Sequence, residues 1–237
     1  MTDEYVCVRL SSDEANRERI KGFKNSGNPN LVEYLRTDAW EEDQSDWNAV
    51  YLIFSSDDES VPVLFFALKC GMISSPFPID VLKLLNDEKE KIIREMPEDK
   101  LETLEYIKEF IQDAETNASV NKVASTIPGV ELSHFCMNEA FKEKYEKIGI
   151  KTKGLGEFLF YNNIVPVLRE IRERVGCRFM YLFAADASED RSLIRYYREH
   201  LGFVTMEEFD VSILGNRDIV PIMPLYDYQC EFMIWSL

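Results

Sequence analysis

The stretch from residue 130 to residue 186 restricts the fold more than any other part of the sequence. It begins with the apolar segment VELSHFCM (130–137) and ends with the continuously apolar segment FMYLFAAD (179–186). Between them lie a loop with two glycines and a long segment whose apolar residues recur at helical spacing. A strand, a helix and a second strand in this order predict a β-α-β unit with parallel strands, and therefore an α/β fold.

Antiparallel strands are expected before this unit. The apolar segments WNAVYLIF (47–54) and VPVLFFALKC (61–70) are separated by SSDDES, whose residues favour a turn, so they predict a hairpin. Alternating segments at 5–10, 202–209 and 228–237 predict three further strands.

Several helices are also expected. Ser11 and Glu14 have the spacing of a capping box, which predicts a helix to about residue 23. Shorter helices are predicted at 31–36 and 188–200. Residues 37–46 (TDAWEEDQSD) are expected to form a solvated acidic link, and Pro166 is expected to kink the helix that follows the glycines.

The composition changes between the hairpin and the β-α-β unit. Residues 79–96 and 98–114 are rich in Glu, Lys and Asp and are separated by Pro97, which suits the first position of a helix. We expect a helical hairpin inserted at about 76–120, before the fourth strand of the sheet. The predicted architecture is thus a single α/β domain over residues 1–237, with a mixed sheet flanked by helices.

Charge and cysteine content restrict the partners. The net charge of −16 and the pI of about 4.6 disfavour contact with phosphate backbones, so nucleic acid is not expected as a partner. The acidic charge by itself favours an explanation by solubility, and attraction of a cationic amine substrate is the alternative. The five cysteines have no regular spacing, which predicts reduced thiols and a cytoplasmic location. Two histidines argue against a His-rich metal site, and no apolar run is long enough for a membrane span. The oligomeric state is left open, a homodimer included.

The glycine loop KTKGLG (151–156) is a candidate anion site. The first turn of a helix has unpaired N–H groups, glycines let a phosphate approach the backbone, and Lys151 and Lys153 add positive charge. A plain turn into a helix explains the glycines equally well. The loop is not a Walker motif, and Leu159 replaces the third glycine of a dinucleotide fingerprint.

Three segments together resemble the GNAT family of acyl-CoA-dependent N-acetyltransferases. KTKGLG resembles the family's Q/R-x-x-G-x-G/A loop, and FCMNEAF (135–141) resembles the end of its fourth strand. SEDRSLIRYYREHLGF (188–203) is similar to its closing motif, with Asp190 in the Asn place and Tyr196-Tyr197 in the Phe-Tyr place. This sequence departs from the family in having Lys151 for Gln or Arg and about nine extra residues before the loop.

The resemblance implies direct transfer of an acetyl group from acetyl-CoA to an amine, without a metal. It implies that Tyr197 is the general acid, with Tyr196 as the alternative. His134 and Glu131 are candidate bases, and strand alternation is expected to place His134 on the same face as Leu132. The implied CoA-binding residues are Phe135, Met137, Lys151, Thr152, Lys153, Gly154, Leu155, Gly156 and Glu157.

Three functions follow from these expectations. The first is an N-acetyltransferase that acts on a primary amine, either a small molecule or a protein amine. The second is a tRNA-acetylating toxin of the same family, against which the acidic composition argues. The third is a non-catalytic acyl-CoA-binding or interaction module.

Overall fold

A computed structural model describes residues 5–76, 123–147, 154–186, 188–205, 208–209, 220–221 and 230–237. The chain contains two compact units. The first comprises Met1–Gly71, Pro128–Phe209 and Pro224–Leu237, and the second comprises Met72–Ile127 and Asp210–Met223. Residues 77–120 of the expected helical insertion lie outside the described residues. The assignment of residues 1–237 to a single domain stays a prediction.

The elements have the following bounds. The strands are β1 (Tyr5–Arg9), β2 (Ala49–Ser55), β3 (Leu64–Pro76), β4 (Val123–Met137), β5 (Phe179–Ala184), β6 (Val204–Thr205), β7 (Val220–Pro221) and β8 (Glu231–Ser236). The α-helices are α1 (Asn16–Arg19), α2 (Pro29–Thr37), α3 (Ala39–Gln44), α6 (Glu139–Lys147), α7 (Leu155–Leu159), α8 (Val165–Val175) and α9 (Ser192–Glu199). Short 3-10 helices are η1 (Leu10–Ser12) and η2 (Ile20–Gly22), and η4 (Phe160–Ile164) is π-helical.

The sheet is mixed, as the sequence predicts. Its described strands follow the order β1-β2-β3-β4-β5-β8-β6, and β7 pairs with β3. Strands β2 and β3 are antiparallel, which confirms the hairpin. Strands β4 and β5 are parallel, which confirms the β-α-β unit, and β8 pairs antiparallel with β5. An α/β fold with a mixed sheet flanked by helices is therefore confirmed.

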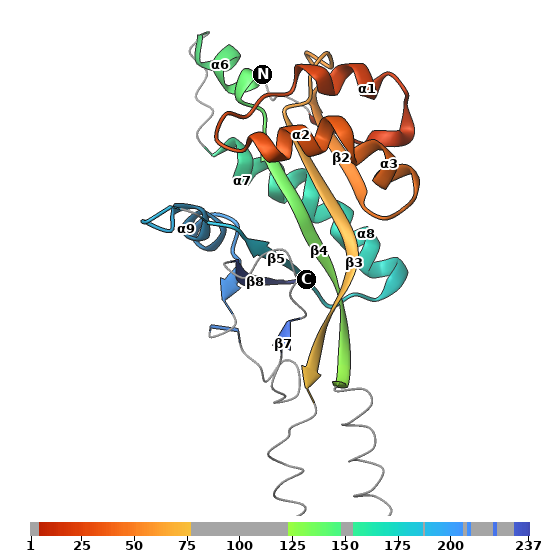
Figure 1. Cartoon of the computed structure of the whole chain (residues 1–237), viewed down its shortest axis with the longest axis vertical. Helices are drawn as coiled ribbons and strands as arrows, with labels where there is room; N and C mark the ends of the chain where they lie inside the picture. The colour runs from red at the N-terminus through yellow and green to blue at the C-terminus, as the bar shows by residue number, and fades with distance from the viewer. Residues whose placement is uncertain are drawn as a thin grey trace, which may run out of the picture. The chain divides into compact units, whose positions relative to one another are not determined.

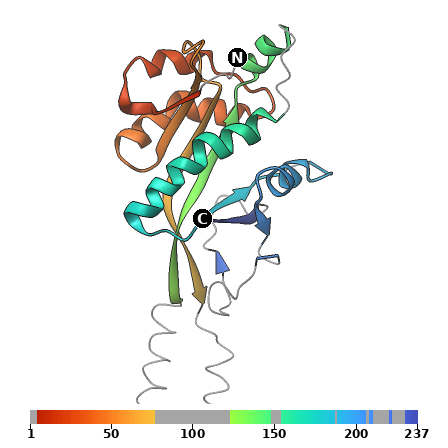
Figure 2. The same ribbon diagram turned by 180° about the vertical axis from the view of Figure 1, so that it is seen from behind.

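Helices cover both faces of the sheet. Figure 1 shows α1, α2 and α3 in front of β2, β3 and β4, and Figure 2, seen from behind, shows the helix formed by α7, η4 and α8 in front of the same strands. Each layer buries its own core, because the side chains of a strand alternate between the two faces. Phe65 and Ala67 of β3 face α1–α3, whereas Leu64, Phe66 and Leu68 face α7–α8. Within the described residues no helix combines the length and the apolar character of a membrane span.

The stretch 37–46 is not the solvated link that its composition suggests. Residues Ala39–Gln44 form helix α3, and Trp40 is buried in the core between α1–α3 and the sheet. Asp43 is also buried, and its carboxylate accepts hydrogen bonds from Arg9 Nε at 2.7 Å and from the backbone N–H groups of Ser11 and Val50 at 2.7 and 2.8 Å. An acidic residue can be buried here because a cation and two donors compensate it.

The helix expected at 11–23 is broken into three pieces, η1, α1 and η2. The capping box does not form. Instead Asp13 Oδ1 accepts a hydrogen bond from the backbone N–H of Ala15, and the backbone N–H of Ser11 binds Asp43. The contact with Asp43, which is distant in the sequence, outcompetes the local cap. The strand expected at 202–209 is shorter, and β6 covers only Val204–Thr205.

The long helix after the glycines runs from Leu155 to Val175 through a π-helical segment. Pro166 lies in the first turn of α8, directly after that segment. Because proline lacks an N–H group, the backbone hydrogen bonds before it rearrange, and the change from α to π geometry takes the place of a sharp kink. Phe160, Ile164 and Leu168 still face the core, whereas Val175 is exposed.

The environment of Asp43 generates the first prediction. Asp43→Asn removes a buried charge that faces the Arg9 guanidinium, so the free energy of unfolding should fall by about 3 kcal/mol, as when a buried ion pair loses one partner. Urea denaturation followed by circular dichroism measures the change. Asp46→Asn is the matched control, because Asp46 binds the same arginine at 2.6 Å but its side chain is 80% exposed. That variant should lose less than about 1 kcal/mol, and equal losses in the two variants would contradict the prediction.

Candidate active site

The parallel pairing of β4 with β5 is short. It joins Gly129 to Phe179, Val130 to Met180 and Glu131 to Tyr181, and it goes no further, although β4 continues to Met137 and β5 to Ala184. Beyond Glu131 the two strands part, and the edge of β4 from residue 132 to residue 137 no longer has β5 as its ladder partner. Backbone N–H and C=O groups require partners, so this edge of β4 can receive an extended ligand.

In the same stretch of β4, the side chains change the face of the sheet to which they point. Leu132 belongs to the core under α7–α8, whereas His134 stacks on Tyr34 of α2 and Cys136 belongs to the core under α1–α3. Strict alternation would keep all three on one face, so the expectation that His134 and Leu132 share a face is wrong. A local interruption of the alternation between Leu132 and His134 places Phe135 on the α7–α8 side of the sheet.

Tyr197 lies beside this part of β4. Its ring packs against Phe135, with ring centroids 6.5 Å apart, and against Phe203 at 5.8 Å. The side chain is buried, but its hydroxyl has no hydrogen-bond partner among the described residues. The residue is 8% exposed.

Burial raises the pKa of Tyr197, and the neighbouring Tyr196, Cys136 and Asp186 raise it further when they are charged. The phenol therefore keeps its proton well above neutral pH. A protonated hydroxyl of this kind can donate a proton to a basic leaving group. The structure brings Tyr197 and Phe135 together, and the role of Tyr197 as the acid stays a prediction.

The two glycines of the loop are required for different structural reasons. Gly154 has a φ of 88° and is the N-cap of α7, and a Cβ added to it would meet nothing within 4 Å. It is required by its left-handed conformation. Gly156 is required by a neighbour, because a Cβ there would lie 2.5 Å from the hydroxyl oxygen of Tyr196. Lys151, Thr152 and Lys153 lie outside the described residues.

Tyr196 therefore occupies a different place from Tyr197. Its hydroxyl lies against Gly156 at the start of α7, near Met137 Sδ, and its ring is tilted against that of His200 at 5.3 Å. Burial, followed by the charge of Glu157, raises the pKa of Tyr196 to about 12. Glu157 in turn lies 3.1 Å from His200 Nδ1. Gly154, Leu155, Gly156 and Glu157, which the resemblance predicts to bind the cofactor, thus form the first turn of α7, beside Tyr196.

The N-terminus of α9 is held by a residue that the sequence motif does not single out. Asp186 follows β5, and its Oδ2 accepts hydrogen bonds from the backbone N–H groups of Leu193 and Ile194 at 2.9 and 3.1 Å. Although desolvation works in the opposite direction, the hydrogen bonds from Ser188, Ile194 and Leu193 lower the pKa of Asp186 to about 2. Asp190, which takes the Asn place of the family motif, instead pairs with Arg195 on the surface. In the sequence, the sign of this role is the position of Asp186 at the end of an apolar strand.

Glu131 stands where β4 and β5 begin to part. Its carboxylate is buried, lies 3.5 Å from Lys69 Nζ and accepts a hydrogen bond from the Tyr181 hydroxyl at 3.3 Å. Gly71 of β3 leaves the room for that hydroxyl, because a Cβ at Gly71 would lie 1.8 Å from it. Of the two candidate bases, Glu131 is therefore an ion-paired group at the last β4–β5 pair.

His134 is enclosed by a polar network on the α1–α3 side. Its ring is parallel to that of Tyr34 within 1°, with centroids 3.9 Å apart, and Ser133 Oγ lies 3.1 Å from its Nδ1. The Tyr34 hydroxyl donates to Glu42 at 2.8 Å. Burial lowers the pKa of His134 to about 4; Glu42 opposes the shift and Lys69 adds to it. This histidine is neutral at physiological pH.

The comparisons with known proteins concern the fold. No protein-family model and no curated protein matches the sequence. Solved structures do match: a Tyr-to-Phe mutant of KacT (TM-score 0.53, 13% identity, 98% of this chain and 95% of that chain) and AtaTR bound with AcCoA (0.52, 13%, 100% and 94%). AtaT complexed with acetyl-methionyl-tRNAfMet also matches (0.51, 10%, 98% and 95%). The chain has the GNAT fold.

The comparisons correct one expectation from the composition. Nucleic acid was not expected as a partner because of the net charge of −16. Among proteins with this GNAT fold, AtaT has been solved with a tRNA, and KacTA with DNA (TM-score 0.52, 13% identity). Net charge is a property of the whole chain, whereas nucleic-acid binding depends on local patches, so the exclusion was wrong.

The two glycines generate the second prediction. Gly156→Ala should destabilise the protein by about 1–2 kcal/mol, because the new methyl group meets the Tyr196 hydroxyl. Only the hydroxyl oxygen clashes, since the adjacent ring carbon would lie 3.7 Å away. Adding Tyr196→Phe should therefore restore most of the loss, which thermal or urea unfolding can measure as a double-mutant cycle.

Gly154→Ala is the control for this cycle. It should cost a similar free energy through backbone strain, and Tyr196→Phe should not restore it. Rescue of both alanine variants, or of neither, would contradict the assigned roles.

The network around His134 generates the third prediction. The unfolded chain binds a proton at the ordinary histidine pKa of 6.5, whereas the folded protein does so only near 4. This contribution to stability is complete above pH 6.5 and is lost as the pH falls towards 4, and it can reach about 3 kcal/mol. His134→Phe keeps the ring stack and should remove that part of the pH dependence of the unfolding free energy. The exposed control His200→Asn should keep it. Parallel profiles for wild type and His134→Phe would show that His134 does not titrate as described.

Proposed function

We propose that this protein is an acetyl-CoA-dependent N-acetyltransferase whose acceptor is the α-amino group of an aminoacyl-tRNA. The observation that carries the proposal is the parting of β4 from β5 beyond Glu131, with the protonated Tyr197 beside the open edge. The same fold occurs in AtaTR bound with AcCoA and in AtaT with acetyl-methionyl-tRNAfMet, which supports both the donor and the acceptor.

The residues present fit acetyl-CoA. The edge of β4 near Phe135 and Met137 lacks β5 as a ladder partner, so its backbone groups can bind an extended chain. Gly154 holds the start of α7 in a conformation with open space around its Cα. Under this proposal the backbone N–H groups from Lys153 to Glu157 bind the pyrophosphate, with Lys151 and Thr152 completing the loop.

The chemistry divides between donor and protein. Acetyl-CoA, when bound, supplies an acetyl group activated as a thioester. The backbone N–H groups near Phe135 and Met137 polarise its carbonyl group, as preorganised donors do in other acyl transfers. Tyr197 donates the proton that the leaving thiolate requires, because its raised pKa keeps the phenol protonated until that moment. The nitrogen that attacks releases one proton to solvent, and the phenolate of Tyr197 takes up a proton again, so the products are the amide and the free thiol of CoA.

The acceptor must lose a proton before it attacks. An α-amino group has a pKa of about 7.7–8.0, compared with about 10.4 for a lysine amine, so roughly a quarter of the α-amine is neutral at about pH 7.4, against about a thousandth of a lysine amine. Such an acceptor needs no strong base. Neither candidate base is free to act as a strong base, because Glu131 is ion-paired and His134 is enclosed. An acceptor that needs no strong base agrees with this arrangement. A small cationic amine, favoured by the acidic composition, is supported less well than aminoacyl-tRNA.

The fourth prediction tests this function. The full-length protein is incubated with acetyl-CoA and with aminoacyl-tRNA, deacylated tRNA, lysine or a polyamine, and free thiol and acetylated product are measured. Aminoacyl-tRNA should release thiol, with a rate that is about half-maximal near pH 8 and levels off above it. Tyr197→Phe should lower turnover by roughly a hundredfold or more. Tyr196→Phe is the matched control and should remain active.

Each other outcome overturns one part of the proposed function. Turnover of lysine or polyamine without turnover of aminoacyl-tRNA would reject the acceptor. An active Tyr197→Phe together with an inactive Tyr196→Phe would move the acid to the neighbouring residue. Thermal stabilisation by acetyl-CoA without turnover of any acceptor would identify a binding module, and no stabilisation at all would reject the donor. The cytoplasm, where both substrates occur, is the proposed location.

A further inference from the structure

An acidic protein that acts on tRNA needs a local cationic surface. The segment from residue 15 to residue 37 carries a local excess of basic residues. Residues 15–37 contain five basic residues and two acidic ones, whereas the whole chain has a net charge of −16. The basic residues are Arg17, Arg19, Lys21, Lys24 and Arg36. Phosphate backbones are recognised by such local clusters of Lys and Arg rather than by the charge of the whole protein.

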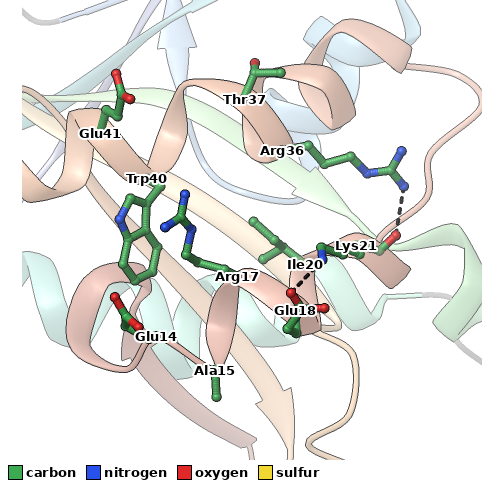
Figure 3. A pocket seen from close by; sticks show the side chains of 10 residues that line it. All are labelled: Glu14, Ala15, Arg17, Glu18, Ile20, Lys21, Arg36, Thr37, Trp40 and Glu41. Carbon is green, nitrogen blue, oxygen red and sulfur yellow. Dashed lines mark hydrogen bonds and ion pairs between the residues drawn. The ribbon is translucent and has the colours of Figure 1, made fainter.

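Figure 3 shows how part of this cluster is arranged. Arg17, Lys21 and Arg36 line a groove of about 690 Å³ between α1–η2 and the α2–α3 region. The Arg17 guanidinium lies 5.0 Å from the ring centroid of Trp40, which forms another wall. A guanidinium held over an aromatic ring loses less conformational freedom when it binds a phosphate than a freely moving side chain does.

A second groove continues the first. It has a volume of about 560 Å³, is lined by Lys24, Asn25 and Ser26, and shares Arg36 and Thr37 with the first groove. Arg36 is fixed between the two, because its Nη2 donates to the backbone carbonyls of Lys21 and Phe23 at 3.0 and 2.7 Å. The remaining N–H groups of that guanidinium can bind a ligand.

The second groove leads to the reactive end of β4. Asn25 Nδ2 donates to the backbone carbonyl of Met137 at 3.0 Å, and the backbone N–H of Lys24 donates to Asn138 Oδ1 at 3.1 Å. Met137 ends the edge of β4 that lacks β5 as a partner. A polyanion that presents its terminal group at this edge can therefore continue along Lys24, Arg36 and Arg17.

Acidic residues also line both grooves, and the ion pairs that they form determine which basic residues stay unpaired. Lys21 forms an ion pair with Glu18 at 2.5 Å, and Glu139 binds the backbone N–H of Ser26. Arg17, Lys24 and Arg36 form no ion pair within the described part of the chain. The other acidic residues of the two grooves are Glu14, Glu33 and Glu41, so the two linings together hold five glutamates and four basic residues, and phosphate contacts depend on the three unpaired cations individually.

The other basic helix near the site is arranged differently. At the N-cap of α9 and on the helix, Arg191, Arg195 and Arg198 each pair with a carboxylate, from Glu231, Asp190 and Glu208 respectively. Helix α8 also carries arginines without an ion pair among the described residues, at positions 169 and 172. However, α8 covers the opposite face of the sheet from α1–α3, as Figures 1 and 2 show.

We propose that the two adjoining grooves of the α1–α2 segment, through Arg17, Lys24 and Arg36, bind the phosphate backbone of the tRNA whose aminoacyl end enters the site. This inference rests on the proposed function and adds the surface that holds the acceptor. The contacts are ionic and independent of base identity, so they set affinity and orientation rather than sequence preference.

The fifth prediction tests the surface with two double variants of equal charge. Arg17→Gln/Lys24→Gln removes two cations from the grooves, and neither side chain makes a hydrogen bond within the described residues. Arg169→Gln/Arg172→Gln removes two cations from α8. Binding of deacylated tRNA is measured by fluorescence anisotropy between 50 and 200 mM salt. The slope of log K against log salt should decrease by about 2 for the groove variant and stay unchanged for the α8 variant.

The outcomes separate this inference from the proposed function. Thermal unfolding first confirms that both variants fold. If wild type acetylates aminoacyl-tRNA while the two variants bind tRNA equally well, the groove assignment is overturned and the function stands. If the α8 variant alone loses affinity, the surface lies on the other face. If wild type neither binds tRNA nor acetylates aminoacyl-tRNA, both proposals are overturned. A loss confined to the groove variant, together with a raised KM for aminoacyl-tRNA and unaltered stabilisation by acetyl-CoA, supports the inference.

Discussion

The candidate site depends on the short ladder between β4 and β5. Three residue pairs hold the strands together, and beyond Glu131 they part. If the ladder continued, β5 would pair with β4 up to His134, and no ligand could bind that part of the edge. The ladder ends next to the point where β4 changes the faces of its side chains, between Leu132 and His134. Interruptions of this kind are frequent beside active sites, because they redirect side chains and end pairing.

This geometry also separates the two sides of the site. Phe135 faces the α7–α8 layer together with Tyr197, so the groups suited to the donor lie on that side. His134 faces the α1–α3 layer, where the grooves proposed for tRNA also lie. A single strand with one irregularity can in this way present a donor site and an acceptor site on opposite faces of one sheet.

The net charge of this protein does not describe how its charges are distributed over the surface. Many of its carboxylates are occupied by structural tasks: Asp43 holds Arg9 and two backbone N–H groups, and Asp186 holds the start of α9. On α9, the arginines are likewise neutralised by acidic partners. The cations that remain without an acidic partner determine where a polyanion can bind, and their number is not visible in the net charge. Electrostatic attraction over a Debye length depends on this local balance.

The sequence alone determined the α/β class, the β2–β3 hairpin, the β-α-β unit and the GNAT resemblance, because apolar periodicity and glycine spacing are local properties. Contacts between distant residues decided the rest. Helix α3 replaced an expected link because Trp40 and Asp43 found partners in the core, and the capping box at Ser11 lost to Asp43. The glycine pair looked like one motif, but only packing showed that Gly154 serves a backbone conformation and Gly156 the Tyr196 hydroxyl. Likewise, two adjacent tyrosines in one helix are equivalent in the sequence, and only the tertiary structure buried one ring against Phe135 and set the other against α7, because residues one position apart on a helix point in different directions.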